Sequence, residues 1–183
     1  MFKNIFKIKK ESSSILLSIF NILEDKNLSQ EIVIKNYGAI LLKPLNSNHL
    51  ISSYEDISNN IDQHKINGFL NFKFNSDDHG ITWAILETKS NAQLINGIDQ
   101  VSNKIASMDM GDSMIGCVFI ATFREQKSYI ICNYRTSKFY PFIPSSKNSR
   151  DNELELDLGY QLELNKIPVE NHVNWYPLWE SLI

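Results

Sequence analysis

The segment FLNFKFNSDDHGITWAILET, residues 69–88, is the part of the chain that best defines its fold class. Apolar side chains occupy alternate positions on both sides of the polar stretch 75–80: Leu70, Phe72, Phe74, Ile81, Trp83 and Ile85. A period of two indicates β-strands with one buried face, and an Asp- and Gly-containing stretch between two such runs indicates a hairpin turn. We therefore predict an antiparallel hairpin here.

Helices are predicted on both sides of this hairpin. Apolar residues at helical spacing follow possible N-caps in three places, and the three segments are 15–23 after Ser12–Ser14, 54–61 after Ser52 or Ser53, and 94–108 after Ser90 or Asn91. Gly111 is expected to end the last of these helices. The long helix should present one apolar stripe to a core.

Two further strand pairs are predicted. The runs 32–34 and 39–42 flank Asn36-Tyr37-Gly38 and indicate a hairpin or two edge strands, the second ending at Lys43-Pro44. The runs 116–124 and 128–135 flank Gln126-Lys127, and a two-residue turn there would place Cys117 opposite Thr136 and Cys132 opposite Ala121. No disulfide is expected from that register, and both cysteines are interpreted as small buried hydrophobes.

This order of elements predicts an α+β fold in which antiparallel hairpins alternate with helices. The pattern is similar to the sandwich of type III secretion chaperones, and residues 138–183 are expected to form an aromatic-rich C-terminal extension. With 183 residues, the chain is predicted to hold a leader at 1–11 and a single domain at 12–183. It has no apolar run long enough for a membrane span and no recognisable signal peptide, and its two cysteines fit a reducing cytoplasm.

Charge is distributed unevenly along the chain. The formal net charge is -3, but residues 1–10 hold four lysines and no acid, which leaves 14 basic against 21 acidic residues in the body. An acidic body argues against nucleic-acid binding. The leader has the spacing of a basic amphipathic helix, and its candidate membrane contacts are Phe2, Lys3, Ile5, Phe6, Lys7 and Lys10. A solvated N-terminal tail is the alternative interpretation.

No recognisable catalytic or cofactor motif occurs in the sequence, and we expect a protein that is not an enzyme and has no metal or cofactor. Asp77-Asp78-His79 offers three metal-ligand types together, but a solvated turn explains them better. Glu153, Glu155 and Asp157 alternate with leucines, a pattern typical of one acidic face of a strand or of the polar side of an irregular segment.

Candidate partner- or ligand-binding residues lie in the C-terminal third. Arg150-Asp151-Asn152 is the most site-like polar cluster, since the chain has only three arginines. In the alternative interpretation, Asp151 and Asn152 cap the next element and Arg150 pairs with an acid. The aromatic candidates are core anchors or interface anchors, and they are Tyr140, Phe142, Trp175 and Trp179.

The chain resembles the PspA-associated protein PspAB family. The residues that carry the resemblance are Gly38, Lys43-Pro44, Gly80–Trp83, Phe139–Phe142, Pro144, Arg150–Asn152, Leu154–Leu156, Pro168–Glu170 and Trp175–Trp179. The resemblance implies a soluble accessory of PspA, an ESCRT-III-like coiled-coil protein that protects stressed membranes. It also implies an occasional association with a membrane zinc protease of the heat-shock type, and it supplies no catalytic residues.

Three functions follow as hypotheses. The first is a cytoplasmic adaptor that binds a PspA-like partner, with the leader at the inner face of the cell membrane. The second is an enzyme or small-ligand binder with a pocket near Arg150–Asn152. The third is a chaperone-like scaffold that holds a peptide in an exposed apolar groove.

Overall fold

The structure, a computed structural model, describes residues 15–44, 57 and 69–179. Its helices are α2 (Phe20–Glu24), α3 (Leu28–Glu31), α5 (Asn91–Ser107) and α6 (Asn152–Leu164), with short 3-10 turns η1 (Gly111–Ser113) and η2 (His172–Asn174). Its strands are β1 (Ile32–Leu42), β2 (Phe69–Ser76), β3 (Thr82–Thr88), β4 (Met114–Phe123), β5 (Gln126–Asn133), β6 (Lys138–Phe142), β7 (Pro144–Ser146) and β8 (Ser149–Arg150). The predicted α+β class is confirmed. Within these residues no helix has the length and apolarity needed to span a bilayer.

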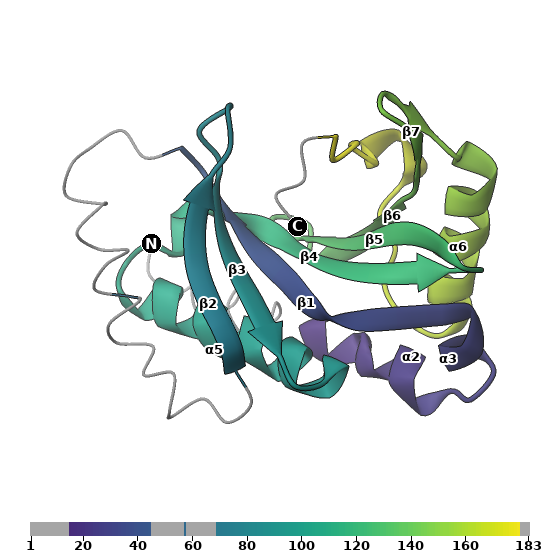
Figure 1. Cartoon of the computed structure of the whole chain (residues 1–183), viewed down its shortest axis with the longest axis horizontal. Coiled ribbons are helices and arrows are strands. Elements are labelled where there is room, and N and C mark those ends of the chain that lie inside the picture. The colour runs from purple at the N-terminus through teal and green to yellow at the C-terminus, as the bar shows by residue number, and fades with distance from the viewer. Residues whose placement is uncertain (1–14, 45–56, 58–68, 180–183) are drawn as a thin grey trace.

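Six strands form one antiparallel sheet in the order β2-β3-β1-β4-β5-β6. Strands β7 and β8 form a separate two-stranded ribbon beside the start of α6 (Figure 1). On the outer side of β6, Phe139 N–H donates to Pro168 O and Glu170 N–H donates to Phe139 O. The aromatic segment therefore supplies a strand of the main sheet, and residues 168–170 pair with the outer side of that strand.

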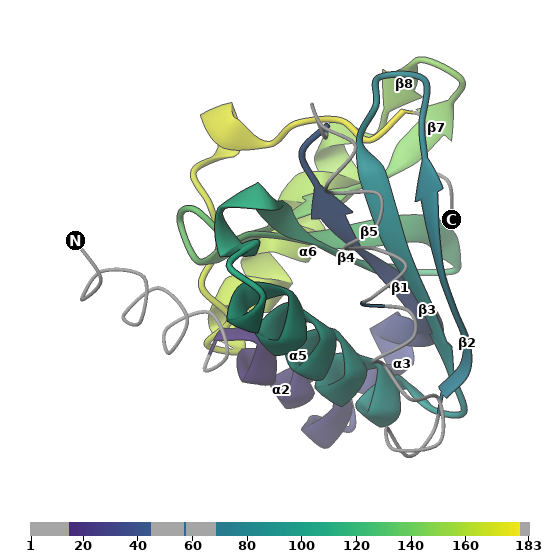
Figure 2. The same ribbon diagram turned by 90° about the vertical axis from the view of Figure 1, so that its left-hand side faces the viewer.

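The sheet has an apolar core on each face. Helices α2 and α5 lie on one face (Figure 2), where Phe119 and Phe123 of β4 pack in the main core with apolar residues of α5. On the opposite face, Trp83 and Val118 belong to a second core that includes Trp175, and Leu178 packs against it. The C-terminal segment thus covers the apolar core on the second face, as the helices cover the core on the first face.

The hairpin predicted at 69–88 is confirmed as β2 and β3. The expectation of one buried face was wrong, because β3 lies inside the sheet and is buried on both faces, and Leu70 is exposed. The long helix is also confirmed, with the Ser90 hydroxyl accepting a hydrogen bond from Gln93 N–H as its N-cap. The prediction that Gly111 ends this helix was wrong: α5 ends at Ser107, Asp109 takes a left-handed φ of 59°, and Gly111 begins η1. The first helix is interrupted at Ile19, and α3 was not predicted. The predicted caps at 12–14 and most of the helix at 54–61 lie outside the described residues, although Ile57 is buried.

The prediction of two strands around Asn36-Tyr37-Gly38 was wrong. Residues 32–42 form one continuous strand, β1, which lies inside the sheet between β3 and β4. The expected turn is an irregularity in its pairing with β4, between Ile34 and Gly38. A Cβ on Gly38 would lie 2.6 Å from Val118 O, so glycine permits the close approach of the two strands.

The predicted register of the second hairpin was also wrong. Its turn consists of Arg124 and Glu125, which both adopt positive φ angles of 46° and 69°, as a two-residue turn of the I′ kind requires. Cys117 therefore lies directly opposite Cys132. Both are buried free thiols, in agreement with their interpretation as small core residues.

Candidate partner-binding site around the C-terminal helix

Helix α6 begins at the polar cluster that the sequence singled out. The Asp151 side chain accepts a hydrogen bond from Leu154 N–H at 3.0 Å, which makes Asp151 the N-cap, and Asn152 is the first helical residue. The Asp151 N–H donates to Ile143 O at 2.8 Å and so ties the cap to the end of β6. The strand or irregular segment predicted from the alternation of Glu153, Glu155 and Asp157 was wrong, because an Asp cap and acidic residues in the first turn favour a helix.

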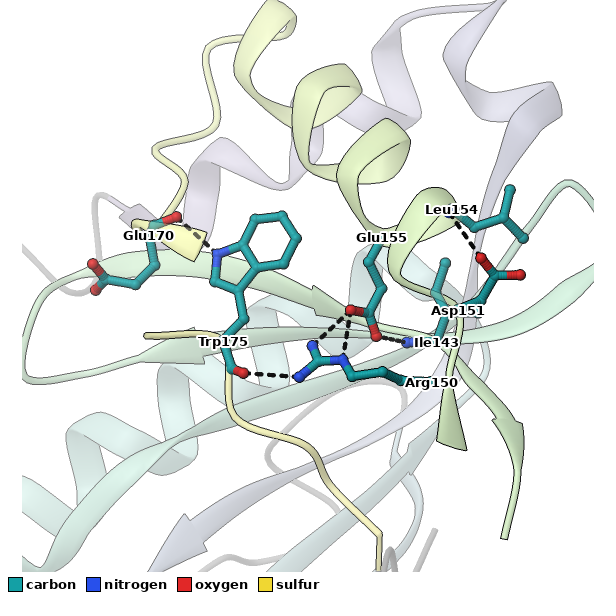
Figure 3. A network of polar contacts seen from close by, with 7 residues as sticks. All are labelled: Ile143, Arg150, Asp151, Leu154, Glu155, Glu170 and Trp175. Carbon is teal, nitrogen blue, oxygen red and sulfur yellow. Dashed lines mark hydrogen bonds and ion pairs between the residues drawn. The ribbon is translucent and has the colours of Figure 1, made fainter. Parts of the chain in front are cut away.

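Arg150 and Glu155 form an ion pair under the first turn of α6 (Figure 3). Arg150 Nε donates to Glu155 Oε2 at 2.7 Å, and Nη2 lies 2.6 Å from the same oxygen. The other carboxylate oxygen accepts from Ile143 N–H at 2.8 Å, while the guanidinium lies 5.5 Å from the ring centre of Phe142. Glu155 has no exposed side-chain surface, so its charge depends on these partners.

The same arginine holds the C-terminal segment. Arg150 Nη1 donates to Trp175 O at 2.9 Å, and Trp175 Nε1 donates to Glu170 O at 2.8 Å (Figure 3). The indole lies against Gly159 of α6, where an added Cβ would come within 2.6 Å of the ring. One arginine therefore joins the sheet edge, α6 and the segment that follows α6.

Glu170 stabilises the base of this segment. Burial alone would raise its pKa, but hydrogen bonds from Thr136, the Asn171 N–H and the Asn174 side chain lower the pKa below its ordinary value, with help from the charge of Lys138. Nearby, burial raises the pKa of Tyr140 to about 12 despite the opposing charge of Arg150. Both groups are thus held in their usual neutral-pH forms, a carboxylate and a neutral phenol.

The structure brings most of the predicted site residues together. Phe142 and Trp175 are buried, and Trp179 packs edge-on against Phe142 with its ring centre 5.1 Å away. Arg150 pairs with an acid and Asp151 caps a helix, as the alternative interpretation of that cluster states. The leader candidates, Phe2 to Lys10, lie outside the described residues.

Sequence reasoning missed the outer surface of α6. Leu156, Tyr160 and Leu164 are 52%, 60% and 58% exposed, and we call these three residues the outer row. Their spacing of four residues is the signal that could have found them, since it places all three on one side of a helix. The alternation of acidic residues and leucines over residues 153–158 indicated a strand instead, and so the four-residue spacing was overlooked.

A cavity of about 740 Å³ lies elsewhere, at the end of the sheet where β1 and β5 end and β4 begins. Most of its lining residues are apolar or aromatic, and they include Leu41, Ala106, Met114 and Leu178. Of the predicted site residues only Tyr140 contributes to it, so the described cavity is not beside Arg150–Asn152.

The Asp77-Asp78-His79 segment forms the turn between β2 and β3. Asp77 Oδ1 accepts from His79 N–H at 3.0 Å and from Ile81 N–H at 2.9 Å, and Oδ2 accepts from Trp83 Nε1 at 2.9 Å. These bonds satisfy both carboxylate oxygens. In the part of the chain that the structure describes, no group of three or more His, Cys, Asp or Glu side chains could hold a metal ion.

Fold and site together define an α+β protein with a six-stranded antiparallel sheet, two apolar cores and a C-terminal segment bound by one arginine. The chain belongs to the PspAB family, PspA associated protein B, whose model matches residues 13–182. No curated protein and no solved structure matches significantly, so the similarity to type III secretion chaperones stays a prediction.

Proposed function

We propose that this protein is a non-enzymatic accessory of the membrane-stress response that binds a PspA-like coiled-coil protein. Its family supports an association with PspA. The observation that carries the proposal is the clustering of exposed large apolar side chains: of nine among the described residues, six fall between 156 and 179. They are Leu156, Tyr160, Leu164, Val173, Tyr176 and Trp179. Leu156, Tyr160 and Leu164 share one side of α6, and exposed apolar side chains gathered on one side of a helix are typical of a protein-binding surface.

The test is co-purification. The full chain, tagged and expressed in its host under membrane stress, should enrich the PspA-like protein over an unrelated bait of similar size and charge. An untagged strain controls for non-specific capture. Equal recovery with both baits would refute the adaptor proposal.

The leader is proposed to assist at the cytoplasmic face of the membrane. Its lysines and apolar residues support this, because a basic amphipathic segment gains about 1 kcal/mol per lysine near an anionic surface. The full chain should sediment with vesicles that contain phosphatidylglycerol, less so at high salt. The triple variant Lys3→Glu, Lys7→Glu, Lys10→Glu should sediment less. Equal sedimentation would refute this role alone. A link to a membrane zinc protease of the heat-shock type rests on the family resemblance and is tested by the same co-purification.

The cavity favours a second candidate function, the binding of a small apolar ligand. Its volume of about 740 Å³ lies within the range of about 300–1,000 Å³ that ligand sites occupy. The full chain should increase the fluorescence of anilinonaphthalene sulfonate, and Ala106→Trp, which narrows the cavity, should abolish the increase. An unchanged signal in that variant would exclude the cavity as the dye site.

A further inference from the structure

Helix α6 is apolar on two opposite sides. Leu158 and Leu162 are fully buried in the main core, and Gly159 lies against Trp175. The outer row points to the other side, since a step of about 100° per residue separates Leu156 from Leu158 by about 200°. An ordinary surface helix has one apolar side, so the outer row is not explained by folding.

The border of the outer row is acidic. Helix α6 carries Glu153, Glu155, Asp157 and Glu163 and no basic residue. Glu155 pairs with Arg150, and Asp157 pairs with Arg124 at 2.8 Å. Glu153 and Glu163 are exposed, and neither makes an ion pair with the described residues. Lys166 follows the C-cap residue Asn165 and so lies beyond the end of the helix.

The helix is held rigidly from its inner side. The Asp151 cap, the buried pair of Arg150 with Glu155, and the contact of Gly159 with Trp175 fix its position on the sheet. A binding surface on such a support loses little conformational entropy when a partner docks.

We propose that the outer row docks an amphipathic α-helix of a partner protein, whose apolar stripe is bordered by lysine or arginine. Residues spaced by four form the ridge that packs into the groove of a second helix at a crossing angle of about −50°. The acidic border selects basic flanks. The identification of this partner with a PspA-like coiled coil rests on the proposed function, whereas the surface itself does not.

The experiment uses two labelled peptides of about three heptads, with Leu at the a and d positions and either Lys or Glu at e and g. Fluorescence anisotropy with the full chain should show binding of the Lys peptide at least about tenfold tighter than of the Glu peptide, a difference that shrinks at about 0.5 M salt. Equal binding of the two peptides, or of neither, would overturn the proposal.

Variants then locate the site. Leu156→Ser, Tyr160→Ser and Leu164→Ser should each weaken binding of the Lys peptide about tenfold or more, and Glu163→Lys should reduce the preference for it. Leu70→Ser is the matched control, because Leu70 is 55% exposed but lies on β2. A loss with Leu70→Ser equal to that with Leu156→Ser would overturn the assignment. Circular dichroism checks that each variant is folded.

Two other occupants are distinguished in the same series. Self-association of the unliganded chain that Tyr160→Ser abolishes would assign the outer row to a second copy and overturn the proposal. Tighter peptide binding by a Phe2→Ser, Phe6→Ser variant would assign it to the leader and also overturn it. If the Lys peptide binds but the PspA-like protein does not co-purify, the surface stands and the proposed function fails. If the PspA-like protein co-purifies but the Lys peptide does not bind, the proposed function stands and the outer row is rejected as the docking surface.

Discussion

Arg150 and Glu155 pair at 2.6 Å beneath the first turn of α6, with the carboxylate wholly buried and the guanidinium over the Phe142 ring and bonded to Trp175 O. The pair connects three parts of the chain that are separate in sequence: the end of β6 through Ile143, the helix through Glu155 and the C-terminal segment through Trp175. The contribution of this ion pair should therefore be measurable in the free energy of unfolding and in the order of the C-terminal segment.

Arg150→Ala should lower the free energy of unfolding by about 3–5 kcal/mol, because it leaves the buried Glu155 carboxylate without its cation. Arg124→Ala is the matched control. Its pairs with Glu31 and Asp157 are about half exposed and screened by water, so this change should lower the free energy of unfolding far less than Arg150→Ala. Urea unfolding of both variants measures the difference, and equal losses would contradict the role assigned to Arg150.

Gly159→Ala should destabilise the protein, although alanine ordinarily stabilises a helix by about 1 kcal/mol relative to glycine. The reason is steric, since the new methyl would lie 2.6 Å from the Trp175 ring. Gly111→Ala is the control, because its nearest neighbour would be 3.7 Å away. Combining Gly159→Ala with Trp175→Leu should remove the steric penalty, and thermal unfolding of the double-mutant cycle reports this coupling.

Stability should fall as pH rises from 10 to 12, with a contribution from Tyr140. Burial raises the folded-state pKa of Tyr140 to about 12, while the unfolded value is 10.0. Between these two pKa values the folded state retains a proton that the unfolded state has released. The contribution of Tyr140 to stability is therefore complete below pH 10 and is lost as the pH rises toward 12. Tyr140→Phe should flatten the decline in urea midpoint over this interval. An unchanged slope would show that Tyr140 does not contribute.

Glu170 should make the protein less stable at acidic pH, whereas Tyr140 makes it less stable at alkaline pH. Its folded-state pKa lies below the ordinary 4.5, so its stabilising effect is present above pH 4.5 and lost as pH falls through the lower folded value. Glu170→Gln should be less stable at pH 7 and show a smaller loss on acidification. Urea midpoints measured from pH 6 to pH 3 test both expectations.

Elements defined by local signals could be predicted from the sequence. The hairpin at 69–88 follows from apolar residues at alternate positions on both sides of a segment of turn residues, and α5 follows from an apolar stripe after Ser90. The turn at Arg124-Glu125 could not, because neither residue is a usual positive-φ residue and the choice of turn was settled by pairing along the whole of β4 and β5.

The candidate site was predicted only as a set of residues. The structure brings Arg150, Phe142 and Trp175 together, but their contact depends on a glycine at 159 and a buried acid at 155, and both effects arise from tertiary packing. The alternation of Leu and Glu in 153–158 resembled a strand because a helix with two apolar sides has no single stripe.

The central position of β1 has a consequence for the order of folding. Strands β2 and β3 form one hairpin and β4, β5 and β6 form one meander, and both are built from neighbours in sequence. Only β1 joins them, through pairing with β3 and β4 over long stretches of chain. Local pairs close faster than distant ones, so we expect two preassembled modules whose union by β1 limits the folding rate. Until that step, β3 and β4 would each have an unpaired edge, and Gly38, which permits the close approach, would influence how long these edges remain open to aggregation.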